Sequence, residues 1–206
     1  MADSGNSKQA SMTVITPEAM LSYPHLFEPV QQEGRPKPEY SCCLVFAPAT
    51  DLAKLRQAVG AAATEKWGEK AREMARNEQI RLPFRTDVAD KYPDGSTFIN
   101  VKSTRKPEIV SIYAGPDGKP QVIDDEDHVY AGCFVRASLR AFAYEQSGNR
   151  GVSLALGNIQ KLKDGERLGG FRHAADEFEA LEGAQDEVLG AAPAPTVSPE
   201  SEDPFA

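Results

Sequence analysis

The sequence predicts a mainly β fold, a small Greek-key barrel of antiparallel strands with one inserted α-helix, followed by an acidic tail that does not fold. Three observations predict it. Runs in which apolar and polar residues alternate with a period of two recur through much of the chain. A single segment has extended helical periodicity instead. The 15 prolines and 16 glycines among 206 residues place turns between these runs.

The N-terminal part contains two predicted strands separated by a long loop. Residues 1–11 are small and polar, which is typical of a disordered terminus. Met12–Ile15 is a short strand candidate, and the proline-rich segment Pro17–Pro38 is interpreted as a loop. Tyr40–Ala47 (YSCCLVFA) is rich in residues that favour strands and is followed by a proline, so it is the second predicted strand.

The next segment predicts the helix. Asp51 is a suitable N-terminal cap, and helical periodicity of apolar residues continues to about Asn77. Gly60 and Gly68 weaken this helix, so its stability depends on packing an apolar stripe onto the sheet. The stripe consists of Leu52, Leu55, Val59, Ala62, Ala63, Trp67, Ala71 and Met74.

Beyond the helix, apolar and polar residues again alternate with a period of two. Turn sequences such as Pro93-Asp94-Gly95 and Ser147-Gly148-Asn149 separate the runs. Together with the earlier strands, these runs make five or six predicted strands. One helix inserted among about five antiparallel strands fits the OB-fold, a five-stranded Greek-key barrel. A β-sandwich is the alternative. The four later strands are predicted at Thr97–Lys106, Ile109–Tyr113, Val129–Tyr144 and Val152–Leu162.

The net charge of −8 is concentrated at the C-terminal end. Residues 174–206 contain nine Asp and Glu and no Lys or Arg, so 22 of the 31 acids remain elsewhere against 23 Lys and Arg. The body therefore carries a charge of +1 and has room for a basic face. The tail cannot bury enough apolar surface to fold. We expect an OB-fold domain over residues 12–173 and a disordered acidic tail over residues 174–206.

Several function classes lack their sequence signals. No apolar stretch is long enough to cross a bilayer and the start has no secretory signal, so a cytoplasmic protein without a membrane partner is expected. Cys42, Cys43 and Cys133 are odd in number and two are adjacent, which predicts reduced packing residues. No catalytic motif or phosphate-cradling loop is present, so neither an enzyme nor a cofactor is predicted.

The acidic cluster Asp124–Asp127 leaves one catalytic alternative open, a metal-dependent nuclease. Consecutive acids do not all converge on one ion. The histidines, His25, His128 and His173, are scattered and lack the paired spacing of a zinc site. A solvated loop is therefore the favoured interpretation of the cluster, and no metal is expected.

The segment Cys133–Tyr144 is the most informative about function, because successive side chains of a strand point to opposite faces. Its odd positions are small and apolar, as a tight barrel interior requires. Its even positions interleave aromatic rings with arginines, which suits a single strand of nucleic acid, since rings stack on bases and cations bind phosphates. The even positions are Phe134, Arg136, Ser138, Arg140, Phe142 and Tyr144.

Thr97–Lys106 repeats this arrangement, with Ile99 and Val101 on one face and Phe98, Asn100, Lys102 and Lys106 on the other. In the alternative interpretation, the phenylalanines are core residues beneath the helix and only the arginines reach solvent. The residues predicted to bind nucleic acid are Phe98, Lys102, Arg105, Lys106, Tyr113, Phe134, Arg136, Arg140, Phe142 and Tyr144.

The C-terminal tip, Asp203, Pro204 and Phe205, carries an apolar ring on an acidic arm. Two roles follow. The acids of the arm compete with nucleic acid for the basic groove, and the ring anchors in a pocket of a partner protein. A tail that only increases solubility is the alternative.

The sequence resembles the phage-encoded single-stranded DNA-binding proteins of the OB-fold type over most of residues 12–170. The resemblance rests on Tyr130–Val135, Ala141–Tyr144, Gly151–Gln160 and Asp164–Glu166. Asp203, Pro204 and Phe205 are similar to the acidic tips by which such proteins recruit replication and repair enzymes, although Ala206 follows the phenylalanine here.

This resemblance implies a protein that binds and protects single-stranded DNA with little sequence specificity during phage DNA replication or recombination. It would act in the cytoplasm of the infected bacterial host, would not be an enzyme, and would recruit replication or recombination proteins through its tail. A homodimer is compatible with the sequence. Besides the nuclease, a protein-interaction adaptor that works through the tail alone is the remaining alternative.

Overall fold

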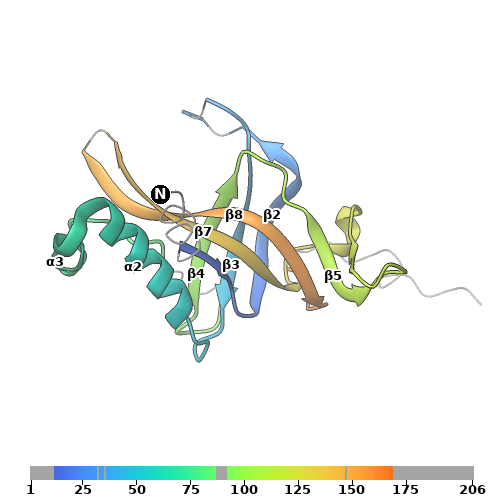
Figure 1. Ribbon diagram of the computed structural model, residues 1–206. Helices are drawn as coiled ribbons and strands as arrows, with labels where there is room; N and C mark the ends of the chain where they lie inside the picture. Colours follow the sequence, from blue (N-terminus) through green and yellow to red (C-terminus); the bar gives the residue numbers. More distant parts are fainter. Residues whose placement is uncertain (1–11, 32, 35, 87–91, 147, 169–206) are drawn as a thin grey trace, which may run out of the picture. The chain divides into compact units, whose positions relative to one another are not determined.

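The computed structural model describes residues 12–31, 33–34, 36–86, 92–146 and 148–168 (Figure 1). The predictions for residues 1–11 and for the tail, including Asp203, Pro204 and Phe205, lie outside these ranges. The strands are β1 (Thr13–Ile15), β2 (Ala19–Val30), β3 (Glu39–Phe46), β4 (Thr97–Ser103), β5 (Ile109–Ala114), β6 (Pro120–Val122), β7 (Phe134–Gln146) and β8 (Asn149–Lys163). The helices are α2 (Ala53–Trp67), η1 (Gly68–Lys70), α3 (Ala71–Arg76) and η2 (Glu126–His128).

The eight strands form one sheet in the order β1-β7-β2-β3-β4-β8-β5-β6, with an additional pairing between β7 and β8. β7 pairs with β8 and also with β1 and β2. β2 pairs with β3, β3 with β4, and β4 in parallel with β8. The pairings therefore return to β7 and form a closed circuit. A mainly β architecture with an inserted helix is thus confirmed, with eight strands where five or six were predicted.

β2 corrects the prediction of a loop at Pro17–Pro38. Its register with β3 shifts between Ser22 and His25 and again between His25 and Val30, and Tyr23 has a positive φ of 46°. Because proline has no N–H to donate, it is tolerated in a strand at such irregularities, and Pro24 lies within the first of them. The strand buries Leu26 at 1% exposure, so it belongs to the sheet despite its prolines.

The predicted helix begins one residue later than expected, with Leu52 in place of Asp51 as its N-cap, and it is interrupted. The Asp51 carboxylate accepts a hydrogen bond from the N–H of Ala53 at 2.8 Å. α2 ends at Gly68, whose φ of +62° and ψ of −144° are readily adopted only by glycine, and α3 follows after one 3-10 turn. Within the described residues, no helix has the length and apolar content needed to cross a membrane.

The main core lies between α2 and the inward faces of the strands. Leu55, Val59 and Ala62 from the helix pack in the same cluster as Leu139 and Ala141 of β7. All three cysteines of the chain are buried and none takes part in a disulfide, and their burial agrees with the prediction of packing residues. Burial raises the pKa of the Cys42 and Cys133 thiols, so both favour the neutral form and act as packing residues.

Candidate nucleic-acid interface

The two faces of β7 differ as the alternation predicts. The odd positions from Val135 to Ala141 are at most 1% exposed and belong to the main core. On the other face, Arg136 and Arg140 are exposed and Phe142 is 37% exposed. Phe134 and Tyr144 on that face are half-buried. Because α2 packs in the core cluster formed by the odd positions, the even positions are not sealed beneath the helix.

The neighbouring strand places small residues beside these side chains. Across the antiparallel pair, Tyr144 lies opposite Gly151, Phe142 opposite Ser153 and Arg140 opposite Ala155. Each small residue of β8 therefore shares a face with a large residue of β7. We call this surface the β7–β8 face; it consists of Phe134, Arg136, Ser138, Arg140, Phe142, Tyr144, Gly151, Ser153, Ala155, Gly157, Gln160 and Lys163.

Two glycines of β8 occupy positions where the surrounding atoms leave no room for a Cβ. A Cβ at Gly151 would lie 2.6 Å from the Tyr144 hydroxyl and 2.8 Å from the Arg81 carbonyl oxygen. A Cβ at Gly157 would lie 2.9 Å from the carbonyl oxygen of Ser138. Small residues at every second position from Gly151 to Gly157 were a visible sequence signal for this surface, and the alternation on β7 alone did not reveal it.

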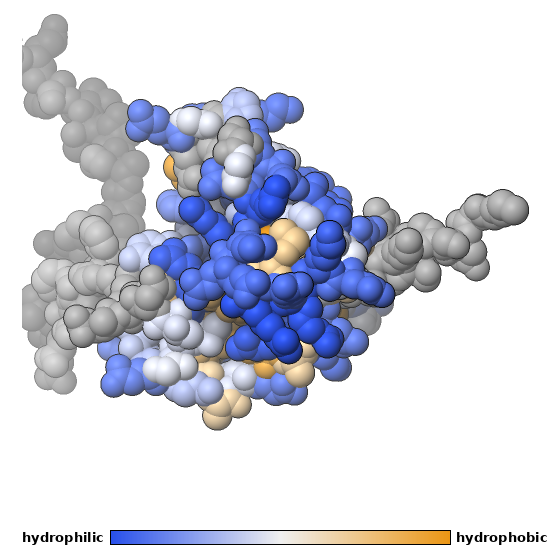
Figure 2. Space-filling view, turned by 90° about the vertical axis from the view of Figure 1, so that its left-hand side faces the viewer, coloured by the Kyte–Doolittle hydropathy of each residue, from blue (hydrophilic) through white to orange (hydrophobic). Residues whose placement is uncertain are grey.

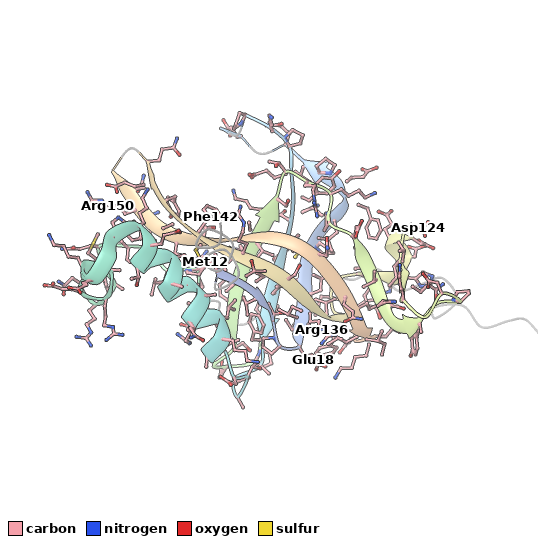
Figure 3. All side chains as sticks on the ribbon, in the orientation of Figure 1. Met12, Glu18, Asp124, Arg136, Phe142 and Arg150 are labelled. Atoms are coloured by element: carbon pink, nitrogen blue, oxygen red, sulfur yellow. The ribbon has the colours of Figure 1, made fainter. Side chains whose placement is uncertain are left out.

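Hydrogen bonds position the Arg136 guanidinium near the Phe134 end of the β7–β8 face. The Arg136 Nε donates to Gln160 Oε1 at 2.7 Å, and Gln160 Nε2 donates to the Ser111 carbonyl at 2.9 Å. Figure 3 shows Arg136 and Phe142 at separate points along β7, with Glu18 near the Arg136 end. Alternate residues of a strand are about 7 Å apart, so the arginines and rings are distributed along the strand rather than gathered at one point.

Lys163 belongs to this face although the sequence did not single it out. It lies opposite Phe134, and its Nζ is 4.5 Å from the centre of the Phe134 ring, a cation–π contact. The same Nζ forms an ion pair with Glu18 at 2.9 Å. Ile15, 61% exposed, lies opposite Ser138 on β1 and adds an apolar contact beside the arginines.

β4 fulfils the second prediction only in part. Ile99 and Val101 point into the main core as expected. Phe98 lies on the other face but is 5% exposed, packed with Cys43, Val45 and Tyr92 in a separate small cluster. The expectation that its ring is open to a base is therefore not met in this structure, because residues before β4 cover that end of the sheet.

The remaining predicted cations and Tyr113 lie at separate places. Lys102 lies opposite Ala155, and so borders the β7–β8 face, and its Nζ is 3.0 Å from Glu39. Arg105 is exposed, and the exposed Lys106 lies 5.9 Å from the Phe27 ring. Tyr113 is 70% exposed and lines a pocket of about 490 Å³ together with Lys161 and Lys163. The pocket thus adjoins the Phe134 end of the face.

A polar cluster fixes the chain beyond the end of β8. The Tyr130 hydroxyl donates to Asp164 at 2.9 Å, and Lys161 forms an ion pair with the same carboxylate at 2.6 Å. These two hydrogen bonds lower the pKa of Asp164, while burial raises the pKa of Tyr130. The Arg167 guanidinium stacks 3.9 Å from the centre of the Tyr130 ring. The Asp164 carboxylate is therefore paired with Tyr130 and Lys161, so its negative charge is partly compensated beside the candidate interface.

The helical side of the molecule offers a contrasting surface. Figure 2 shows that the side bearing α2 and α3 is largely hydrophilic. Its exposed charges have both signs, as in the run Glu65, Lys66, Glu69, Lys70 and Arg72. Charges of both signs weaken the net attraction for phosphate, so the β7–β8 face is the better candidate.

The acidic cluster forms a turn. The Asp125 carboxylate accepts a hydrogen bond from the N–H of Asp127 at 2.9 Å and caps η2, and all residues from Asp124 to Asp127 are exposed. Throughout the described ranges, no three His, Cys, Asp or Glu residues are grouped so as to hold a metal ion. The geometry therefore adds no support to the nuclease alternative.

Comparisons with known proteins agree on one kind of relative. The family described as "Enterobacter phage Enc34, ssDNA-binding protein" matches residues 12–189. The chain is 30% identical over 186 residues to "putative protein p50" of Acyrthosiphon pisum secondary endosymbiont phage 1, a match that covers 82% of this chain and 94% of that protein.

Several solved structures are similar in fold, among them those of two phage proteins. The single-stranded DNA-binding protein from bacteriophage Enc34, in complex with ssDNA, has a TM-score of 0.60 at 20% identity, and the match covers 77% of this chain and 90% of that one. The single-stranded DNA-binding protein gp2.5 of bacteriophage T7 has a TM-score of 0.55 at 15% identity, covering 82% and 98%.

Proposed function

The chain belongs to the family of the single-stranded DNA-binding protein of Enterobacter phage Enc34, and from this premise we propose that it binds and protects single-stranded DNA during phage DNA replication or recombination. Single-stranded DNA is its partner in the host cell, and binding has little sequence preference. One observation carries this proposal. Along the β7–β8 face, rings and cations point outward together beside a row of small residues.

On this face we place the DNA along β7 and β8. Phe142 and Tyr144 offer rings to the bases, and Arg136 and Arg140 offer cations to the phosphates. Stacking is tolerant of sequence because every base has a flat face, and backbone contacts carry no sequence information. Lys102, Arg105, Lys106 and Tyr113 extend the path at its edges. Phe98 contributes to this DNA path only if the residues that cover its ring, such as Tyr92, move away.

The finer description of the fold is also a proposal. The closed circuit of β2, β3, β4, β8 and β7, with a parallel pair between β4 and β8, supports an OB-fold barrel to which β5 and β6 are added. We assign the DNA-binding domain to residues 12–173 and the acidic tail to residues 174–206. A role without catalysis fits this assignment, because coating a strand needs only binding groups.

Direct binding assays test the function. We expect a labelled single-stranded oligonucleotide to be shifted at lower protein concentration than duplex DNA of the same sequence, with an affinity that falls as salt rises by about 0.7 log units per log unit of salt for each phosphate neutralised. A comparison with RNA and a magnesium or manganese incubation complete the design. Equal affinity for duplex DNA, or no binding at all, would refute the proposal, and cleavage of the DNA would favour the nuclease.

The tail supplies a second test. The tail contains nine Asp and Glu and no Lys or Arg, so we propose that its acids compete with phosphates for the basic face. We also propose that Phe205 anchors a replication or recombination protein. Truncation after His173 is therefore expected to tighten DNA binding at low salt and to have little effect at high salt. Titrations of both proteins at two salt concentrations measure this. Equal affinities at low salt would exclude competition by the tail.

A further inference from the structure

Lys163 of the β7–β8 face and Lys102 beside it are each paired with a glutamate of a neighbouring segment. Lys163 Nζ lies 2.9 Å from Glu18, and Lys102 Nζ lies 3.0 Å from Glu39. We propose that Glu18 and Glu39 set the affinity for DNA by competing with phosphate groups for these two lysines. The inference deepens the proposed function and rests on it.

The strand register places both pairs beside the DNA path. Lys163 lies opposite Phe134 and Lys102 lies opposite Ala155, so both side chains share the outward face with Arg136 and Arg140. Glu39 is two residues before Ser41, which lies opposite Lys102, and therefore projects from the same face of β3. Glu18 immediately precedes β2, whose first residue lies opposite Val135, next to Phe134.

The pairs are open enough to exchange partners. The side chains of Lys163 and Glu18 are 56% and 46% exposed, and those of Lys102 and Glu39 are 30% and 15% exposed. A phosphate that approaches either lysine must displace the carboxylate or remain beside it, and like charges at that distance repel. Both outcomes weaken binding. Because solvent screens the less exposed pair less, the effect of Glu39 is expected to exceed that of Glu18.

A matched control lies on the opposite side of the same hairpin. Glu145 accepts a hydrogen bond from Arg150 Nε at 2.7 Å and one from the α2 residue Trp67 at 3.5 Å. It falls in the odd series of β7 with Ala141 and Ala143, which pack into the main core rather than onto the β7–β8 face. The variant E145Q therefore changes the net charge by the same amount and removes a similar ion pair, but away from the proposed DNA path.

The experiment measures the dissociation constant of a fluorescein-labelled oligothymidylate for the full chain and for E18Q, E39Q and E145Q. At low salt we expect E18Q and E39Q to bind about twofold to fivefold more tightly than wild type, and E145Q to match wild type. The gains should shrink at high salt, since salt screens charges at this distance. K163A and K102A should bind more weakly, and E18Q added to K163A should bring no further gain.

The outcomes separate this inference from the proposed function. If wild type binds the oligonucleotide but E18Q and E39Q do not bind more tightly, the competition is refuted and the function stands. Equal tightening by all three glutamine variants would also refute it, because net charge alone would then explain the gain. Unchanged affinity of K163A and K102A would refute it by removing the two lysines from the DNA path. Failure of wild type to bind would instead refute the function itself.

Discussion

Replacing Arg140 and Phe142 together by alanine is expected to weaken binding of single-stranded DNA by at least about tenfold, the largest functional effect that the structure predicts. Phe142 is 37% exposed on the β7–β8 face, and loss of one stacked base costs about 1–3 kcal/mol. Arg140 is exposed beside it, so its loss also removes one phosphate contact. Anisotropy titrations at several salt concentrations measure both effects.

The salt dependence distinguishes the two side chains. R140A alone should reduce the slope of log affinity against log salt by about 0.7, whereas F142A should lower affinity and leave the slope unchanged. A double variant R72A/L82A is the control, because it removes one exposed arginine and one exposed apolar side chain from the helical side. If the control weakens binding as much as R140A/F142A, the DNA lies on another surface.

Substituting Gly132 by alanine is expected to lower the free energy of unfolding by about 3–5 kcal/mol, the largest effect on stability. Gly132 has a φ of +111°, which L-residues rarely adopt, and its N–H donates to the Leu21 carbonyl at 2.8 Å. A Cβ there would also overlap the carbonyl of Glu166, which belongs to the segment that crosses over this position. Urea unfolding measures the loss.

The control for Gly132 is Gly118. It also has a positive φ, +74°, which lies nearer the left-handed region than that of Gly132, and no atom lies within 4 Å of a Cβ built there, so G118A should cost only the conformational strain of about 1–2 kcal/mol. The difference between the two variants reports the clash with Glu166 together with the greater backbone strain at Gly132. Equal losses would mean that residues 166–168 accommodate the added Cβ at no cost in stability, contrary to this prediction.

Local sequence patterns predicted the elements whose partners are close in the chain. The alternation from Cys133 to Tyr144 indicated which side chains of β7 point inward, because a strand in a hairpin needs only its own turn and its neighbour to settle its faces. The helix was predicted from its periodicity and its Asp51 cap, but Gly68 was not recognised as a break. β2 was missed because Pro24 and Pro29 argue against a regular strand, and only its register shifts with β3 accommodate them.

By itself the sequence determined the mainly β class, the inward and outward faces of β7 and the concentration of acids at the C-terminal end, because each is a property of neighbouring residues. Tertiary structure alone decided which outward residues are accessible. In the folded protein, Phe98 is buried against Tyr92, and Lys102 forms an ion pair with Glu39. If the register of the Gln146–Asn149 pair continued along both strands, Phe134 would lie opposite Lys161, but two register shifts place Lys163 there instead. Such contacts join segments far apart in the chain, where packing decides and no local pattern records the outcome.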